Sequence, residues 1–352
     1  MGEYVQEKGW FPDNLSRIQT ALCAHKTRPG QQAQQPFAVF DFDNTCIFRD
    51  IGQAMFRHQL LQLYYRIPPA TLAALIPEQG PQLAHAPWQV LREAILSHYA
   101  LLWPYLEKNQ REEAKKTSSY LPFTVLLYWF VLKAREEENL GSPYVLALLA
   151  KLQAGFTLQE LQSFCSAILK ETQEEQLAIN YLGAKLPDPL GNIEASYPTG
   201  LKVFEEMREL MKTLLAHNIT PYVISASSDW LVKTAAEQLG FPVQEGHIFG
   251  VRTSMNSEGR VLPESARDFP LTYRKGKSEV IDRFIGNNPF LVAGDADTDY
   301  EMLTRPDAKL RLLINRKQKG LIAQLYTDPE VLLQGLDTGR GCFRPSRETI
   351  GA

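Results

Sequence analysis

The chain has 352 residues, of which 44% are hydrophobic and 22% charged, and its formal net charge at pH 7 is −3. This balance is typical of a globular protein with a sizeable apolar core, and it excludes disordered and fibrous proteins. The sequence pI is near 6.1 and no basic stripe stands out, so we do not expect nucleic acid as a partner.

The sequence also shows no zinc-binding motif, no secretion signal and no membrane-spanning segment. The cysteines and histidines show no CxxC, HxH or HExxH spacing, so we predict reduced thiols and no zinc site. No apolar segment follows a basic start, and no run of about 18 apolar residues occurs. We expect a cytoplasmic protein with no membrane span. Export without an N-terminal signal and the oligomeric state stay open.

Residues 1–36 are predicted to form a helical arm and a linker. Asp13 or Asn14 is the expected N-cap of the helix LSRIQTALCAH. The polar segment from Lys26 to Pro36 contains Pro and Gly and is typical of a loop. The apolar run FAVF that follows is short and ends in acids, which indicates a buried parallel strand leading into a functional loop.

Residues 46–194 show helical character without a strand pattern, and we interpret them as a second domain. The segment is rich in aromatic residues between positions 64 and 130. These rings have two interpretations, which the sequence leaves open. They form the core of this domain, or some of them form a cage for a quaternary ammonium group.

The rest of the chain alternates strands with helices. Strands are predicted at 220–227, 290–297 and 310–316, with helices over 199–218 and 227–240, the latter starting with a Ser cap and stopping at Gly240. A β-hairpin is predicted over 247–263, with its turn at 256–259. This alternation predicts an α/β fold with a doubly wound parallel sheet, which binds ligands at the carboxyl ends of its strands.

Acidic residues follow two of the predicted strands. VFDFDNT carries Asp41 and Asp43, and FLVAGDADTD carries Asp295, Asp297 and Asp299. A single acidic loop is most often a helix cap. Two such loops at the ends of two strands favour a Mg²⁺ site, because this ion prefers a few carboxylate oxygens. Asp295 and Asp299 are expected to face the ion if a helical turn starts here, with Asp297 pointing away.

Ser225 and Lys277 complete the set. Ser225 ends the strand VIS, and we expect it to lie directly before a helix whose amides bind an anion. Lys277 begins the helical segment KSEVIDRF. Alone, such residues are usually a helix cap and an exposed lysine. Together they supply the hydroxyl donor and the cation that a phosphoryl group requires.

The motifs DFDNT, VISAS, GKSEVI and GDADTD, in this order, resemble those of the haloacid dehalogenase superfamily of phosphatases. They cover the core, roughly residues 37–45 and 198–316. The resemblance implies a Rossmann-like core, with Asp41 as the nucleophile and Asp43 as the general acid and base. It also implies that Ser225 and Lys277 bind the phosphoryl group.

The same resemblance implies a Mg²⁺ site. Its ligands would be Asp41, Asp295 and the backbone carbonyl of Asp43, with Asp299 completing the shell directly or through water. Thr45 is expected to fix the loop near the phosphate by hydrogen bonding. We expect phosphate chemistry rather than dehalogenation, because a dehalogenase does not normally need Asp43.

The helical insert after the first motif resembles the cap of the subclass that includes phosphoserine and phosphorylcholine phosphatases. The implied domains are an arm and linker at 1–36, a core at 37–45 and 195–352, and a cap at 46–194. Ala226-Ser227-Ser228 replace the glycine pair of the phosphoserine enzymes, which argues against phosphoserine. Residues 318–352 receive no chemical role.

We therefore predict a Mg²⁺-dependent phosphatase that acts through an aspartyl-phosphate on a small phosphomonoester, such as phosphocholine or an aryl phosphate. One alternative is a binding or regulatory protein that has lost turnover. The other is a phosphoprotein phosphatase acting on phosphotyrosine.

Overall fold

A six-stranded parallel sheet forms the centre of the larger lobe. The computed structural model describes residues 5–25, 35–83 and 85–351, so most of the predicted linker lies outside the described residues. The strands run in the order β12 (Val331–Gln334), β11 (Leu310–Ile314), β10 (Leu291–Gly294), β1 (Phe37–Phe40), β6 (Thr220–Ser228) and β7 (Ile248–Val251). All neighbouring strands are parallel. The predicted α/β fold with a parallel sheet is confirmed.

Helices cover both faces of this sheet because its strands alternate apolar side chains between two cores. Ala38 and Phe40 of β1 belong to one buried cluster, whereas Phe37 and Val39 belong to another. The first face packs against α1 (Pro12–Ala24), α8 (Leu158–Glu174), α9 (Glu205–Ala216) and α10 (Asp229–Gln238). The second packs against α11 (Lys275–Val280), η2 (Ile281–Ile285), α12 (Tyr300–Leu303) and η4 (Leu321–Thr327).

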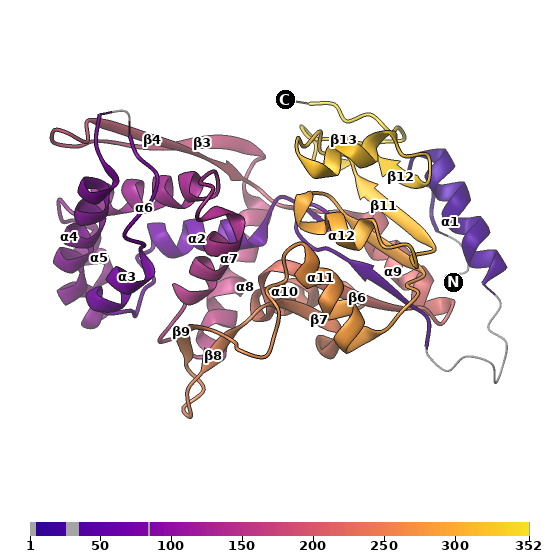
Figure 1. The fold of residues 1–352 in the computed structure, drawn as a ribbon, viewed down its shortest axis with the longest axis horizontal. Coiled ribbons are helices and arrows are strands. Elements are labelled where there is room, and N and C mark those ends of the chain that lie inside the picture. The colour runs from indigo at the N-terminus through magenta and orange to yellow at the C-terminus, as the bar shows by residue number, and fades with distance from the viewer. Residues whose placement is uncertain (1–4, 26–34, 84, 352) are drawn as a thin grey trace.

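A second lobe, with its own buried apolar cluster, lies beside the sheet (Figure 1). Its helices are α2 (Ile51–Leu61), α3 (Pro69–Leu75), α4 (Trp88–Glu107), α5 (Arg111–Lys115), α6 (Tyr120–Ala134) and α7 (Gly141–Lys151). The chain leaves the core at β2 (Ile47–Phe48) and returns at β5 (Lys202–Val203), and these two short strands pair antiparallel. The insert therefore begins and ends at one place. We call this lobe the cap lobe.

The cap lobe also contains a β-hairpin, which corrects the prediction of a purely helical segment. β3 (Ala178–Lys185) and β4 (Asn192–Thr199) pair antiparallel along their whole length. β3 is mostly exposed, and only one side of β4 is buried. Because so little of the ribbon is buried, its sequence lacks the apolar run by which the core strands were recognised.

Helix α8 packs on the core, although it lies inside the predicted cap. Leu161, Cys165, Ile168 and Leu169 are buried in the cluster that contains β1 and α10. The apolar stripe of this helix faces the sheet-covering helices rather than α4 and α6. We therefore propose that α8 belongs with the core and that the cap lobe comprises α2–α7 and the β3–β4 hairpin.

The two ends of the chain complete the sheet edge. β12 adds the last strand, and β13 (Leu336–Asp337) pairs with β14 (Cys342–Phe343) beyond it. Helix α1 packs against β12, where the buried Asn14 donates to the carbonyl of Leu333 at 2.9 Å. The predicted caps Asp13 and Asn14 are wrong, because the helix begins at Pro12 with Phe11 as N-cap.

The predicted hairpin over 247–263 is shorter than expected. A 3₁₀ turn, η1 (Glu245–His247), leads into β7, which joins the main sheet. Only β8 (Thr253–Met255) and β9 (Val261–Ser265) form the hairpin, with Gly259 at φ +73° in its turn. Across residues 5–25, 35–83 and 85–351, no helix combines the length and apolar character needed to cross a membrane. The cytoplasmic location stays a prediction.

Candidate active site

The predicted site residues gather at the carboxyl ends of three neighbouring strands. Asp41 directly follows β1, Asp295 directly follows β10, and Ser225 lies in β6. The amide of Asp41 donates to the carbonyl of Ala293 in β10 at 2.9 Å, so the sheet holds the two acidic loops together. This is the edge at which parallel sheets bind ligands.

Lys277 is fully buried between two carboxylates. Its Nζ donates to Oδ1 of Asp41 and to Oδ1 of Asp299, at 2.6 Å in both cases. Burial acts to lower the pKa of Lys277, but the charges of Asp299 and Asp41 outweigh it and raise the pKa above its usual value. Lys277 is therefore protonated at neutral pH, and its positive charge lies beside Asp41.

Three buried carboxylates fit a divalent cation. Oxygens of Asp41, Asp295 and Asp299 lie within 4.8 Å of one another. Burial, followed by the charge of Asp299, raises the pKa of Asp41 well above its usual range. Burial also raises the pKa of Asp295, although the neighbouring Arg316 opposes the effect. Lys277 and Arg316 bring only two positive charges to these three carboxylates, so a hard cation would stabilise the ionised form of all three.

Asp299, which is also in the predicted metal set, fixes the loop that carries Asp295. One oxygen of Asp299 accepts the amides of Asp295 at 3.0 Å and Ala296 at 3.2 Å, within η3 (Asp297–Asp299). The hydroxyl of Thr45 lies 3.1 Å from Oδ2 of Asp41 and 3.3 Å from Oδ1 of Asp295. Asp297 accepts the amide of Ile322 at 2.8 Å, so one of its oxygens points toward η4, as expected.

Asp43 has a different environment from Asp41. Its carboxylate accepts the amide of Ile51 at 2.7 Å and the hydroxyls of Ser227 at 2.7 Å and Ser225 at 3.2 Å. Burial, followed by the charge of Asp50, raises its pKa to about 8 against these hydrogen bonds. Asp43 is thus largely protonated at neutral pH and able to act as an acid.

Ser225 does not lie directly before a helix, which corrects the prediction. β6 continues to Ser228, and its register against β7 shifts between Ile224 and Ser228. This irregularity turns the hydroxyls of Ser225 and Ser227 toward Asp43. Helix α10 begins at Asp229, and its N-cap Ser228 makes no capping hydrogen bond, because its hydroxyl donates to Gln153 at 3.3 Å.

A cavity of about 390 Å³ opens between this edge of the sheet and the cap lobe. The cap lobe contributes Arg135, Ser142, Leu146 and Leu149 to its wall. None of the aromatic residues between 64 and 130 lines it. The largest of them, such as Trp88, are buried in the core of the cap lobe. Of the two interpretations of these rings, the structure therefore favours the cap core over an aromatic cage at this site.

Sequence analysis missed several residues of the site. Arg316 donates to Oδ2 of Asp295 at 2.6 Å. It lies two residues beyond β11 at the same sheet edge, and its place at the end of the strand predicted over 310–316 was the signal. Asp50 and Gln153 also line the cavity. Gln153 lies far from every motif, and only the packing of the cap lobe brings it here.

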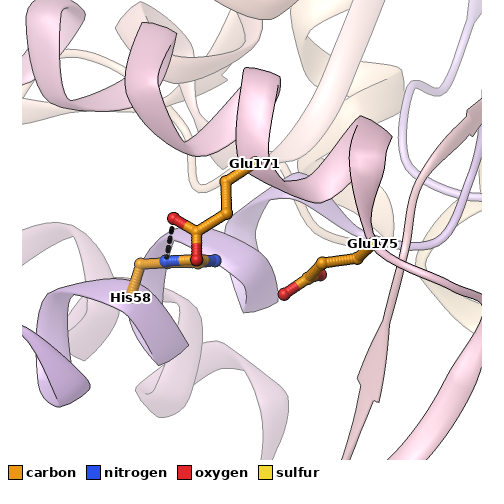
Figure 2. Close-up of side chains that lie close together, drawn as sticks. All are labelled: His58, Glu171 and Glu175. Atoms are coloured by element: carbon orange, nitrogen blue, oxygen red, sulfur yellow. Dashed lines mark ion pairs between the residues drawn. The ribbon is translucent and has the colours of Figure 1, made fainter.

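A second group of possible metal ligands lies where α2 meets α8. Figure 2 shows His58 facing Glu171, with Glu175 beside them. The guanidinium of Arg57 lies between His58 and Glu175. Its Nη2 is 2.7 Å from Nε2 of His58, and 2.9 Å and 2.8 Å from the two carboxylate oxygens of Glu175. Burial and this guanidinium lower the pKa of His58 to about 4. Arg57 thus neutralises Glu175 and keeps His58 in its neutral form, and the third member, Glu171, is 60% exposed to solvent.

Comparisons with known proteins show which proteins this chain resembles. No protein-family model matches the sequence. The curated phosphorylcholine phosphatase of Pseudomonas aeruginosa is 26% identical over 258 residues, which are 62% of this chain and 70% of that enzyme. A solved structure of a conserved, functionally unknown protein from Anaerococcus prevotii covers 100% of both chains, with a TM-score of 0.86 and 23% identity. A substrate-bound phosphoserine phosphatase covers 90% of this chain and 96% of its own, with a TM-score of 0.40 and 13% identity.

Two conclusions follow. The likeness to the Anaerococcus prevotii protein shows that the fold, cap lobe included, exists in a solved structure. The similarity to the curated enzyme confirms the predicted resemblance to haloacid dehalogenase phosphatases and the prediction that the chain is a phosphatase.

Proposed function

We propose that this phosphatase hydrolyses small phosphomonoesters through a covalent aspartyl-phosphate on Asp41. The observation that carries the proposal is the environment of Asp41, a buried carboxylate 2.6 Å from the ammonium of Lys277 and close to two further buried acids. A cation beside an ionised aspartate suits attack on a phosphoryl group, whose oxygens carry negative charge.

In the proposed reaction, an oxygen of Asp41 attacks phosphorus while the leaving oxygen takes a proton from Asp43. Water then attacks the phosphorus of the aspartyl-phosphate and gives a proton to Asp43, which releases phosphate and restores Asp41. Lys277 and Ser225 hold the phosphoryl oxygens, and Thr45 fixes the orientation of Asp41. The pKa of about 8 at Asp43 supports both of its roles, because the group can give and take a proton near neutral pH.

Asp41, Asp295 and the backbone carbonyl of Asp43 would hold Mg²⁺, with Asp299 completing the shell directly or through water. When bound, the ion neutralises negative charge on the phosphoryl oxygens. The grouping of these carboxylate oxygens supports this assignment.

For the leaving group we propose choline, since the curated relative is named a phosphorylcholine phosphatase. Asp50 lines the cavity and offers a negative charge to a cationic group. Its carboxylate also caps α2 by accepting the amide of Gln53 at 2.8 Å. The aryl phosphate alternative has lost its support, because no cap aromatic lines the cavity.

The reaction is tested by phosphate release from p-nitrophenyl phosphate, with and without Mg²⁺. We expect release only with the ion, and a loss of at least about 10³-fold in kcat for Asp41→Asn, because an amide is a poor nucleophile. Asp13→Asn, an exposed residue of α1, is the matched control. Retained turnover in Asp41→Asn would exclude the covalent mechanism. No release by the wild type with any divalent metal would favour the alternative of an inactive binding protein.

The choline proposal is tested with Asp50→Asn, which keeps the helix cap because asparagine caps helices as well as aspartate. We expect kcat/KM for phosphocholine to fall about tenfold more than kcat/KM for p-nitrophenyl phosphate, which lacks the ammonium group. Equal losses on both substrates would show that Asp50 does not bind choline.

A further inference from the structure

The cap lobe contains a second cavity, of about 420 Å³. It lies where the turn between α4 and α5 meets the segment after α2 and the start of α8. Its walls include Tyr65, Trp103, Glu107, Arg111 and Phe156. It shares no lining residue with the cavity at the proposed catalytic residues, so the two are separate sites.

One polar group in its wall is buried without a partner. Tyr65 is only 4% exposed, and its hydroxyl makes no hydrogen bond. The ring itself packs edge-on against Tyr99 and Phe123. Buried hydroxyls nearly always find a partner, since an unmade hydrogen bond is costly. This hydroxyl therefore points to a ligand or ordered water that supplies the missing hydrogen bond.

Two opposite charges at the cavity make no ion pair within the described part of the chain, although the guanidinium of Arg111 lies 5.0 Å from the ring centre of Tyr64. Among the described residues, neither Glu107 nor Arg111 makes an ion pair or a side-chain hydrogen bond. The acids next to Arg111 are already used, because Glu112 pairs with Lys115 and Glu113 with Lys116. The wall thus presents a guanidinium and an exposed carboxylate, neither of which forms an ion pair with a described residue.

A simple cation is not the expected ligand, because aromatic rings of the wall already have other partners. The ring of Tyr64 stacks on Phe156 at 4.3 Å and on Phe164 at 4.1 Å, and the guanidinium of Arg66 lies 4.5 Å from the centre of Phe156. These rings already have partners. The half-buried Trp103 also lines the wall, with its ring centre 6.2 Å from that of Tyr99, and a flat apolar group can pack against it.

From these observations we propose that the cap cavity binds a free aromatic amino acid. Its carboxylate pairs with Arg111, its ammonium pairs with Glu107, and its ring packs against Trp103. A ring hydroxyl, as in tyrosine, supplies the hydrogen bond that Tyr65 lacks. One ligand of this class supplies an ion pair to each charge and a hydrogen bond to the Tyr65 hydroxyl.

Calorimetric titration of the full chain with L-tyrosine and L-phenylalanine tests the proposal. Mg²⁺ and saturating inorganic phosphate are present throughout to occupy the catalytic site. We expect saturable binding with Kd below about 1 mM and tighter binding of tyrosine. Arg111→Gln and Glu107→Gln should each raise Kd about fivefold or more, whereas Lys116→Gln, an exposed residue next to them, should leave it unchanged.

Two analogues assign the charges. 3-Phenylpropionate lacks the ammonium, so its binding should weaken in Arg111→Gln but not in Glu107→Gln. Phenethylamine lacks the carboxylate and should show the reverse. Absence of saturable binding in the presence of phosphate, or wild-type affinity in both variants, would overturn the proposal.

Discussion

Asp41 and Asp43 are only two residues apart, yet their surroundings prepare them for different chemistry. Asp41 faces Lys277 and the other buried acids, whereas Asp43 faces hydroxyls and an amide. Burial raises the pKa of both. The ammonium of Lys277 acts to lower the pKa of Asp41, whereas hydrogen bonds from Ser227, Ile51 and Ser225 do so for Asp43. These different surroundings support the proposal that Asp41 is the nucleophile and Asp43 the acid.

The raised pKa of Asp43 predicts a pH-dependent stability. The folded protein holds this proton up to a pH of about 8, whereas an unfolded chain releases it near pH 4. Between these values the unfolded state binds fewer protons, so stability should fall as pH rises, by about 1–3 kcal/mol for this half-buried group. Denaturant unfolding without divalent ions, from pH 5 to pH 9, measures it. Asp43→Asn should flatten the profile, and an equally steep profile would show that Asp43 titrates normally.

A metal response is predicted from Asp295, whose carboxylate accepts hydrogen bonds from Arg316 and Thr45. If Asp295 binds the ion as proposed, Asp295→Asn removes a charged ligand and should raise the Mg²⁺ concentration for half-maximal activity about tenfold or more. Asp297→Asn, which changes an acid whose oxygen accepts the amide of Ile322, is the control. Unchanged Mg²⁺ dependence in Asp295→Asn would place the ion elsewhere.

At the scale of elements, burial explains which strands the sequence predicted. β1 and β10 are buried along their full length and consist only of apolar residues and glycine, so their pattern is unmistakable. β3 is exposed and was missed. β12 is buried too, but it ends in the polar Gln334, which accepts the amide of Phe11. A hydrogen bond between residues so far apart in the chain leaves no pattern in the local sequence, and β12 was not predicted.

The junction of the cap lobe with the core predicts a destabilising substitution. Arg57 of α2 joins Glu175 to the carbonyl of Pro198, and Glu175 also accepts the amide of Gly200. Arg57→Met leaves Glu175 and His58 without their cation, and the free energy of unfolding should fall by about 2–4 kcal/mol. Lys133→Met breaks an exposed pair with Glu136 and should cost less than about 1 kcal/mol. Equal effects in denaturant unfolding would show that the junction is not held by Arg57.

At the scale of the molecule, the acids of the site were predictable because they follow strands that share one sheet edge. The residues that the cap lobe contributes to the cavity wall could not be predicted. Arg135 and Leu149 reach it through the packing of α6 and α7, and no motif marks helices that cover a site. For the same reason, the sequence shows how many aromatic rings the cap contains but not where they lie, because their location in the cap core depends on packing.

The closed geometry predicts which substrates the enzyme excludes. α7 contacts β6, β7 and β9 of the core, so the cap lobe lies over the cavity rather than beside it. A volume of about 390 Å³ accommodates a small phosphomonoester, whereas a polypeptide on both sides of the phosphorylated residue would have to displace α7.

We therefore expect kcat/KM for free phosphotyrosine to exceed that for phosphotyrosine within a nine-residue peptide by about 100-fold or more. Both substrates have the same leaving group, so the comparison isolates size from chemistry, and the difference corresponds to about 2.7 kcal/mol of transition-state stabilisation. Phosphate release under identical Mg²⁺ and pH measures both constants. If the peptide reacts as fast as the free amino acid, the cap lobe opens wide enough to admit proteins, and the phosphoprotein phosphatase alternative then holds.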